Sequence, residues 1–281
     1  MYHEEIPYRV RKPQSTQDVR REYWEMAKGL QKVDGLTTSQ YLESVAREHI
    51  EGRTTADEAV ESVGRYYDET GGKYDRRERE ADEVSARMVR LLENMTFKFS
   101  PVMLKSIHRE LFAGVLSEGD AGEWRRCNLT KAEEVLGGRS VQYADWNAIQ
   151  DYLSYDFEEE RGYRYQYPFG KAEIQRFARF ISGIWQTHPF REGNTRTTAL
   201  FIQLYAGSMG ITVTNEPFRE NAVFFRDALV RSNYSDITKG IYPDFTYLEA
   251  FFENVFCNAG HDLTGMDLVC YELQIANCEI K

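Results

Sequence analysis

Apolar residues recur at the three- and four-residue spacing of amphipathic helices along most of this chain. In the first 68 residues this spacing predicts three helices, over 15–34, 40–51 and 55–67, and Gly35 and Gly52 are suited to end the first two. We assign these helices to a small module over 15–68, preceded by a polar, flexible arm over 1–14. Three helices this short could barely bury a core alone, so we expect the module to dock on a larger body.

The larger body follows a charged segment, 69–82, in which Gly71-Gly72 and dense charge predict a linker. Helical spacing then recurs over 82–93, 100–112, 145–153, 171–187, 194–205, 217–232 and 245–256, so we assign a second domain to 83–257. The tail, 258–281, shows little periodicity. The whole pattern predicts an all-α fold: a helical core with an N-terminal helical module.

One segment departs from the helical pattern. Two short β-type runs flank Gly137-Gly138 within residues 134–144, and a two-glycine turn between such runs predicts a β-hairpin. An isolated hairpin in a helical protein has an open edge, where another extended segment could pair with it.

Composition narrows the classes of function. The chain has 281 residues, 42% of them apolar, so we expect a packed core. Its net charge of −10 argues against general nucleic-acid binding but allows a local basic cleft. No apolar run is long enough to span a membrane. Four scattered cysteines without metal-ligand spacing suggest a reducing, cytoplasmic setting: Cys127, Cys257, Cys270 and Cys278.

The densest chemistry lies at 188–199, HPFREGNTRTTA, between two helices with buried apolar faces. Gly193 and Asn194 open the second helix, whose first turn offers unpaired N–H groups and the positive end of the helix dipole. Gly193 lets an anion approach the backbone, and Asn194 is a favourable N-cap. Arg196 can add bidentate contacts to phosphate. The segment therefore predicts an anion-binding site for phosphate at residues 193–196, which we call the anion seat.

Two further side chains complete the constellation. The carboxylate of Glu192 would repel phosphate unless a divalent cation lay between them, and Mg²⁺ favours one carboxylate together with phosphate oxygens. His188 is the group here that can take a proton near pH 7. A base, a metal ligand, an anion seat and an arginine together indicate transfer of a phosphate-containing group to a hydroxyl.

The stretch resembles the signature of the Fic family, H-x-F-x-(D/E)-G-N-G-R-x-x-R. Six defining positions match, namely His188, Phe190, Glu192, Gly193, Asn194 and Arg196. The resemblance implies transfer of AMP from ATP to a Ser, Thr or Tyr hydroxyl of a target protein. It implies that His188 is the general base, that Glu192 carries Mg²⁺, and that the phosphates lie on residues 193–196.

Two positions depart from that signature. Thr195 replaces the second glycine and would narrow the seat, and Ala199 replaces the final arginine, which holds the terminal phosphate of ATP in the family. Transfer of a different nucleotide or of phosphate is therefore an alternative. A catalytically weak nucleotide-binding module is another, although binding alone needs no base.

The resemblance extends to two other segments. It implies that the predicted hairpin is a flap that docks an extended segment of the target by strand addition, through Val135, Leu136, Gly137, Gly138, Arg139, Ser140 and Val141. Gly122 to Arg125 is similar to the Gly-x-(Tyr/Trp/Phe)-Arg element that precedes this flap, and we assign Arg125 no catalytic role. His108 is interpreted as a structural histidine. The sequence leaves homo-oligomerisation open.

The N-terminal module is similar to antitoxin-like modules of the family, whose helix ends (S/T)-x-x-x-E-G and whose glutamate pairs with the final arginine of the signature. The candidates here are Asp34, before Gly35, and Glu51, before Gly52, and neither is a full match. Because the arginine is also missing, at Ala199, we expect this inhibition to be lost or altered and the module to serve as a brace.

Overall fold

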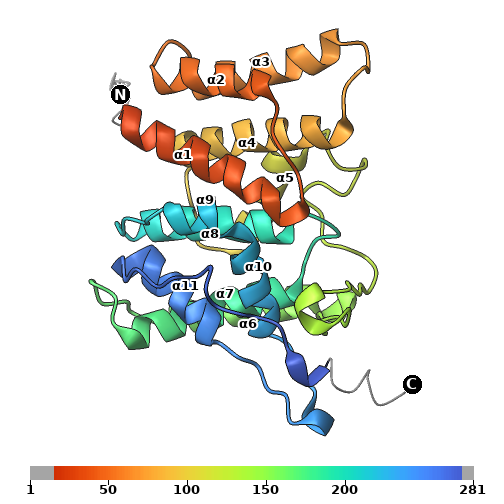
Figure 1. Ribbon diagram of the computed structural model, residues 1–281, viewed down its shortest axis with the longest axis vertical. Helices are drawn as coiled ribbons and strands as arrows, with labels where there is room; N and C mark the ends of the chain where they lie inside the picture. Colours follow the sequence, from red (N-terminus) through yellow and green to blue (C-terminus); the bar gives the residue numbers. More distant parts are fainter. Residues whose placement is uncertain (1–15, 274–281) are drawn as a thin grey trace, which may run out of the picture.

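Helices build the architecture of this protein, as the apolar spacing predicts. The structure is a computed structural model that describes residues 16–273, and the α-helical body is drawn in Figure 1. Its α-helices are α1 (Gln17–Leu30), α2 (Gln40–Ile50), α3 (Ala56–Glu69), α4 (Arg76–Asn94), α5 (Pro101–Phe112), α6 (Ile149–Arg161), α7 (Lys171–Thr187), α8 (Asn194–Ser208), α9 (Glu216–Glu220), α10 (Ala222–Arg231) and α11 (Thr246–Cys257). Short 3₁₀ helices are η1 (Gln31–Asp34), η2 (Glu134–Leu136), η3 (Trp146–Ala148) and η4 (Ile237–Lys239).

Local capping signals fix the ends of the N-terminal helices. The hydroxyl of Ser39 accepts from the backbone of α2, and Thr55 forms a reciprocal capping box with Glu58 at the start of α3. Gly35 adopts the left-handed conformation, with φ 64°, directly after η1. These caps confirm the predicted starts of the second and third helices and the predicted end of the first at Gly35.

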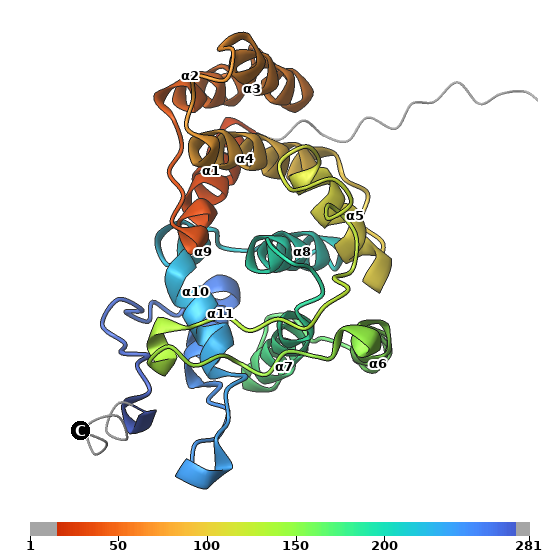
Figure 2. The same ribbon diagram turned by 90° about the vertical axis from the view of Figure 1, so that its right-hand side faces the viewer.

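The helices lie in layers around α8. In Figure 2 the α2–α3 pair lies outermost, α1, α4 and α5 form the next layer, α8 lies in the middle, and α6 and α7 lie below it. Every residue of α8 from Asn194 to Ala206 is buried. A helix that is surrounded on all sides in this way belongs to the centre of a core, not to its surface. The start of α8 is therefore held rigidly from several directions.

The predicted linker is much shorter than residues 69–82. Helix α4 begins at Arg76, where the side chain of Asp75 caps it, and it packs against α1 and α3 as well as α5 and α8. Buried Asp82 accepts hydrogen bonds from the Ser39 hydroxyl (2.5 Å) and the Tyr67 hydroxyl (2.7 Å), and so ties α4 to α2 and α3. The expected boundary at 82/83 thus falls inside a helix that joins both parts.

The predicted β-hairpin is wrong. No β-strand forms between residues 16 and 273, and this segment contains η2 and one isolated bridge between Glu133 and Arg139. The neighbouring side chains of Val135 and Leu136 are both buried. A strand would point successive side chains to opposite faces, so burying both on one side favours a 3₁₀ turn. Gly137 and Gly138 still turn the chain, with positive φ angles.

Two segments near the C-terminus also differ from expectation. The predicted helix 217–232 is divided at Asn221 into α9 and α10. Part of the irregular tail packs on the predicted flap, because the N–H of Cys270 donates to the carbonyl of Val135 at 2.8 Å. The predicted arm, 1–14, and the tail end, 274–281, lie outside the described residues.

The module docks on the larger body through a close approach of α1 to α9. A Cβ atom at Gly29 of α1 would lie 2.4 Å from the carbonyl oxygen of Arg219 in α9. This backbone contact requires glycine, since any side chain would push the two helices apart. It supports the expectation that the module depends on a larger body.

Replacing Gly29 should therefore weaken docking. Gly29→Ala is expected to lower the free energy of unfolding by about 1–3 kcal/mol, the usual cost of forcing atoms into a packed interior. The matched control is Gly64→Ala in α3, where a Cβ atom meets nothing within 4 Å and helix propensity predicts a gain of about 0.5–1 kcal/mol. Urea unfolding of both variants measures the difference, and equal effects would contradict this account of the interface.

Candidate functional site

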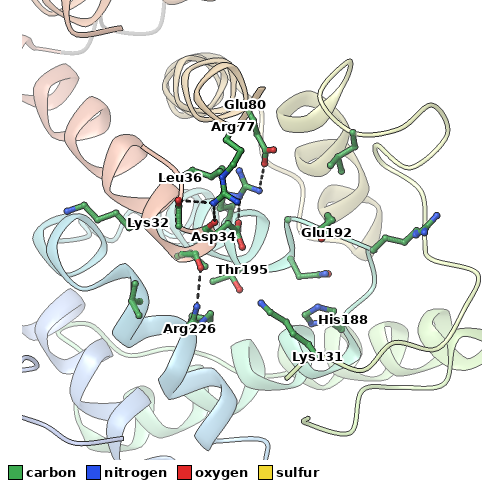
Figure 3. A pocket seen from close by; sticks show the side chains of 18 of the residues that line it. Lys32, Asp34, Leu36, Arg77, Glu80, Lys131, His188, Glu192, Thr195 and Arg226 are labelled. Atoms are coloured by element: carbon green, nitrogen blue, oxygen red, sulfur yellow. Dashed lines mark hydrogen bonds and ion pairs between the residues drawn. The ribbon is translucent and has the colours of Figure 1, made fainter. Parts of the chain in front are cut away.

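A cavity of about 780 Å³ opens beside the start of α8. Its walls come from η1, α4, α8, α10 and the loops around residues 131 and 191 (Figure 3). Six basic and four acidic side chains line it: Lys32, Arg77, Lys131, Arg191, Arg196 and Arg226, against Asp34, Glu80, Glu134 and Glu192. A net basic cavity in a chain of net charge −10 favours an anionic ligand.

Helix α8 presents its N-terminus to this cavity. Gly193 takes the left-handed conformation, with φ 71°, and no N-cap side chain satisfies the first N–H groups of the helix. A Cβ atom at Gly193 would lie 2.4 Å from the Phe112 ring. The glycine is needed for both its conformation and its packing. The uncapped helix start fits the predicted anion seat.

Asn194 has a different role from the predicted N-cap. It is the first residue of α8, and its side-chain amide spans the loop by accepting from the N–H of Phe190 (3.0 Å) and donating to the Phe190 carbonyl (2.8 Å). Gly193 takes the N-cap position instead. The amide therefore fixes the loop that connects His188 to the helix start, without covering the N–H groups.

His188 lies on the opposite wall of the cavity, next to Lys131 (Figure 3). It ends α7 in the left-handed conformation, with φ 47°, and its ring stacks on Tyr143 at a centroid distance of 4.0 Å. Its Nδ1 lies 3.3 Å from the carbonyl oxygen of Trp185. A carbonyl can only accept, so Nδ1 carries the proton, and Nε2 retains a lone pair that can take another.

Burial lowers the pKa of His188 to about 3, and the positive charges of Lys131 and Arg125 contribute in the same direction. The imidazole is therefore neutral at physiological pH, the form that a general base requires. A polyanion bound in the cavity would raise this pKa, because a nearby opposite charge stabilises the imidazolium.

Glu192 lines the cavity between His188 and the N-terminal module (Figure 3). Partial burial raises its pKa, and the neighbouring carboxylates Asp34 and Glu80 raise it further. Among residues 16–273, no three His, Cys, Asp or Glu side chains gather closely enough to hold a metal ion alone. A cation at Glu192 would need oxygen ligands from a bound molecule, which is the usual coordination of Mg²⁺ by a carboxylate and phosphates.

Arg196 is placed beside the anion seat, but its guanidinium already contacts acidic groups. It is 1% exposed, donates to Glu80 at 2.7 Å and to the Gln31 side chain at 3.1 Å, and lies over the Phe112 ring. Its Nε lies 2.8 Å from Oδ2 of Asp34 without the alignment of a hydrogen bond. An incoming anion must therefore compete with two carboxylates for this arginine.

Of the two candidate inhibitory residues, Asp34 lies at the cavity and Glu51 does not. Asp34 lines the cavity and contacts Arg196, so its carboxylate pairs with the first arginine of the signature, whereas the family's inhibitory glutamate pairs with the final one. Position 199 is a buried alanine that does not line the cavity. Glu51 is wrong as a candidate, because it lies at the end of α2, away from the cavity, and pairs with Arg53.

The hydroxyl of Thr195 is directed away from the predicted anion seat by a hydrogen bond. It accepts this hydrogen bond from the indole N–H of Trp185 at 3.0 Å. The side chain lines the cavity while its polar atom faces α7. The replacement of glycine by threonine therefore adds a bond between α7 and α8, in addition to the narrowing expected from its volume.

The predicted flap borders the cavity at one end only. Glu134 and the preceding Lys131 line the cavity, whereas Val135, Leu136 and Val141 are buried in the core. Arg139 donates to the carbonyl of Leu273. The stretch before η2 therefore lines the cavity, and the far end of the segment contacts His188 through the ring of Tyr143. The two glycines between them do not line the cavity.

Several contributing residues escaped the sequence analysis. Lys131 extends its ammonium into the cavity beside His188, and Glu80 reaches Arg196 from α4. Neither lies in a recognisable motif. The interpretation of His108 as structural is confirmed: it accepts from the N–H of Gly122 (2.8 Å) and donates to the Glu192 carbonyl (3.1 Å), so both ring nitrogens are occupied.

Comparison with known families identifies the central segment. Residues 98–206 match the model of the Fic/DOC family, a range that includes α5 to most of α8 and the whole wall formed by 188–196. Comparisons with curated proteins and with solved structures gave no match. Within the described residues, no helix is both long and apolar enough to cross a membrane.

The two buried histidines should make the fold sensitive to acid. His188 and His108 have pKa values of about 3 and about 4 in the fold, against an ordinary value of 6.5. Between about pH 6.5 and pH 4 the unfolded chain binds more protons, so the free energy of unfolding falls as pH drops, by up to about 1.4 kcal/mol per pH unit for each histidine.

Urea unfolding between pH 7.5 and pH 4.5 measures this dependence. In His188→Gln the slope should decrease, because one group that titrates only in the unfolded chain is removed. Buried carboxyl groups such as Glu133, whose pKa is raised by burial, act in the opposite direction but are common to both proteins. An unchanged slope in the variant would show that His188 is not held neutral by the fold.

Proposed function

This chain carries a Fic domain at residues 98–206, and from that premise we propose that the protein transfers AMP from ATP to a Ser, Thr or Tyr hydroxyl of a target protein. Fic-domain proteins typically transfer nucleotide or phosphate groups to proteins. The observation that carries the proposal is the neutral His188, whose Nε2 is available on the wall of a basic cavity that also contains the uncapped start of α8.

The proposed reaction uses these groups in order. Nε2 of His188 accepts the proton of the target hydroxyl, and the oxygen attacks the α-phosphorus of ATP. The new bond joins the hydroxyl oxygen to phosphorus as the bond to the β-phosphate oxygen breaks, so pyrophosphate leaves. The N–H groups at the start of α8, from Gly193 onward, would hold the phosphate oxygens on which charge collects.

Glu192 is the residue that would hold Mg²⁺. Its carboxylate borders the anion seat, and among the described residues no group of three His, Cys, Asp or Glu side chains could hold the ion without oxygen ligands from a bound molecule. When bound, Mg²⁺ neutralises phosphate charge. The raised pKa of Glu192 reflects burial and two nearby carboxylates, and a cation at this position would relieve that repulsion.

A target segment could dock beside residues 129–132, which precede η2 and lead to Lys131 at the cavity. Ser140 supports this stretch by accepting from the N–H of Lys131 at 3.0 Å. An extended peptide that pairs with this backbone edge would place a hydroxyl near His188. Such docking reads main chain and would leave the identity of the target to the surrounding side chains.

Transfer of a different nucleotide or of phosphate is the second candidate. It is favoured by the alanine at 199, which supplies no cation for a terminal phosphate, and by the occupation of Arg196 by Asp34 and Glu80. The mass added to a modified target distinguishes AMP from another nucleotide or from phosphate.

Loss of the base should abolish transfer. His188→Ala is expected to remove label transfer from α-³²P-ATP in the presence of Mg²⁺, to the protein itself or to a lysate, while nucleotide binding measured by calorimetry stays within about threefold of wild type. The stacked neighbour Tyr143 provides a control for packing, since Tyr143→Phe keeps the ring against His188. Equal labelling by wild type and His188→Ala would refute the assignment of the base.

We further propose that Asp34 restrains the site from the N-terminal module. Its carboxylate contacts Arg196, which a bound phosphate would otherwise reach. Asp34→Asn removes the charge at nearly constant volume. It should therefore raise nucleotide affinity by about 5- to 150-fold, the range of typical coupling between two sites.

Calorimetry with ATP and Mg²⁺ measures this change, and label transfer should rise in parallel. Glu51→Gln is the matched control, because Glu51 lies in the same module but away from the cavity and should leave affinity unchanged. An affinity in Asp34→Asn that equals wild type would show that Asp34 braces Arg196 without restraining the site.

A further inference from the structure

We propose that Arg125 is a positioning residue that sets the conformation and orientation of His188, an inference that rests on the role of His188 as the base of the proposed transfer. Arg125 lies in the loop between α5 and η2, 63 residues from His188 in the sequence. It contacts the backbone on both sides of the base and lies outside the wall of the cavity.

The guanidinium of Arg125 binds four backbone carbonyls. Nε donates to the carbonyl of His188 at 2.7 Å, and Nη2 donates to those of Ala144 (2.5 Å) and Thr187 (3.3 Å). Nη1 donates to the carbonyl of Cys127 at 2.6 Å. The backbone N–H of the same residue donates to the carbonyl of Pro189 at 2.8 Å. Arg125 thus donates hydrogen bonds to three consecutive peptide carbonyls, those of residues 187 to 189.

These contacts explain how a charged side chain is buried here. Arg125 is 2% exposed, and the hydrogen-bond partners of its guanidinium among residues 16–273 are all backbone carbonyls. Burial lowers its pKa, which reflects the cost of removing the charge from water. The carbonyls at the end of α7 lack intrahelical partners and form the negative end of the helix dipole, so they stabilise the cation in place of a carboxylate.

These hydrogen bonds are important because the backbone of His188 adopts an unfavourable conformation. Its φ is 47°, and a non-glycine residue in this left-handed region is strained and persists only where surrounding contacts enforce it. Hydrogen bonds to the carbonyls before, at and after the residue fix that backbone. The side chain is then directed between Tyr143 and Trp185, with Nδ1 toward the Trp185 carbonyl.

The same guanidinium joins the base to the stretch 139–144, which ends the predicted flap. Ala144 ends the stretch that includes residues 139–143, and the N–H of Ala144 also donates to the carbonyl of Gln186. One side chain therefore connects the end of α7 to the end of the predicted flap. The position of Tyr143, which precedes Ala144 and stacks on His188, depends on this connection.

Charge is the second contribution of Arg125. Its cation and that of Lys131 both disfavour protonation of His188. The other groups that face His188 are the ring of Tyr143, the indole of Trp185 and its carbonyl, while Glu192 lies across the cavity. Arg125 thus influences both the geometry and the protonation state of the base, and two substitutions can separate these effects.

The test combines ¹⁵N-histidine NMR titration with transfer kinetics on the full chain, with His188→Gln to assign the His188 signals. In Arg125→Met we expect the pKa of His188 to rise and the Nδ1–H tautomer to be less populated. We also expect kcat to fall by about 100-fold, the usual effect of displacing a catalytic group by about 1 Å. The KM for ATP should stay within about twofold. Arg125→Lys keeps the charge, so it should retain the low pKa and still lose kcat.

Arg126→Met is the matched control, because Arg126 is the exposed neighbour and should leave all three readouts unchanged. A folded Arg125→Met with the wild-type tautomer and pKa overturns the proposal, as does an equal effect of Arg126→Met. If Arg125→Met does not fold, two other measurements decide. Arg125→Lys supports the proposal if kcat falls and overturns it if kcat stays at the wild-type value. In the wild type, slow hydrogen exchange of the Arg125 Nε–H supports the proposal, and rapid exchange overturns it. The titration is independent of transfer, so an inactive wild type would refute the proposed function and leave this test intact.

Discussion

The site depends on one constraint: helix α8 is enclosed on all sides by other helices while its first residues open on a cavity. Burial of its length from Asn194 to Ala206 leaves the helix no freedom to shift. The N–H groups at its start are therefore held in fixed directions before any ligand arrives. Preorganised donors of this kind stabilise a developing charge without reorganisation.

The loop before α8 has the same character, since polar side chains fix it by hydrogen bonds to its backbone. Asn194 holds Phe190, His108 holds the carbonyl of Glu192, and Arg125 holds residues 187 to 189. None of these three side chains supplies the proposed base or metal ligand. Their common effect is to convert a loop that would otherwise be mobile into a wall of fixed shape.

The N-terminal module completes the cavity through electrostatics as well as packing. Asp34 from η1 and Glu80 from α4 both contact the buried Arg196, so residues distant in the sequence share one cation. Removing a partner from a buried ion pair leaves an uncompensated charge, which makes such a cluster sensitive to whatever binds beside it. The module is therefore part of the site, and the division of the chain into two domains describes the sequence better than the structure.

Much of the fold and the composition of the site could be predicted from the sequence. Helical periodicity and caps such as Thr55 and Gly35 are local, and His188, Glu192 and Gly193 lie within six residues of one another. The sequence could not predict the 3₁₀ turn in place of a hairpin, because the burial of both Val135 and Leu136 depends on α10. It also could not reveal the contacts of Arg125 and Glu80, which join residues 63 to 116 positions apart.

The sequence by itself thus determined the helices, the residue types of the predicted anion seat and the histidine that we propose as the base. Only the tertiary structure decided which charges surround them: that Asp34 meets Arg196, that Glu51 does not, and that Lys131 lies beside His188. The physical reason is that helix formation and capping depend on neighbours within a few residues, whereas the protonation state and accessibility of a side chain depend on every charge and surface packed around it.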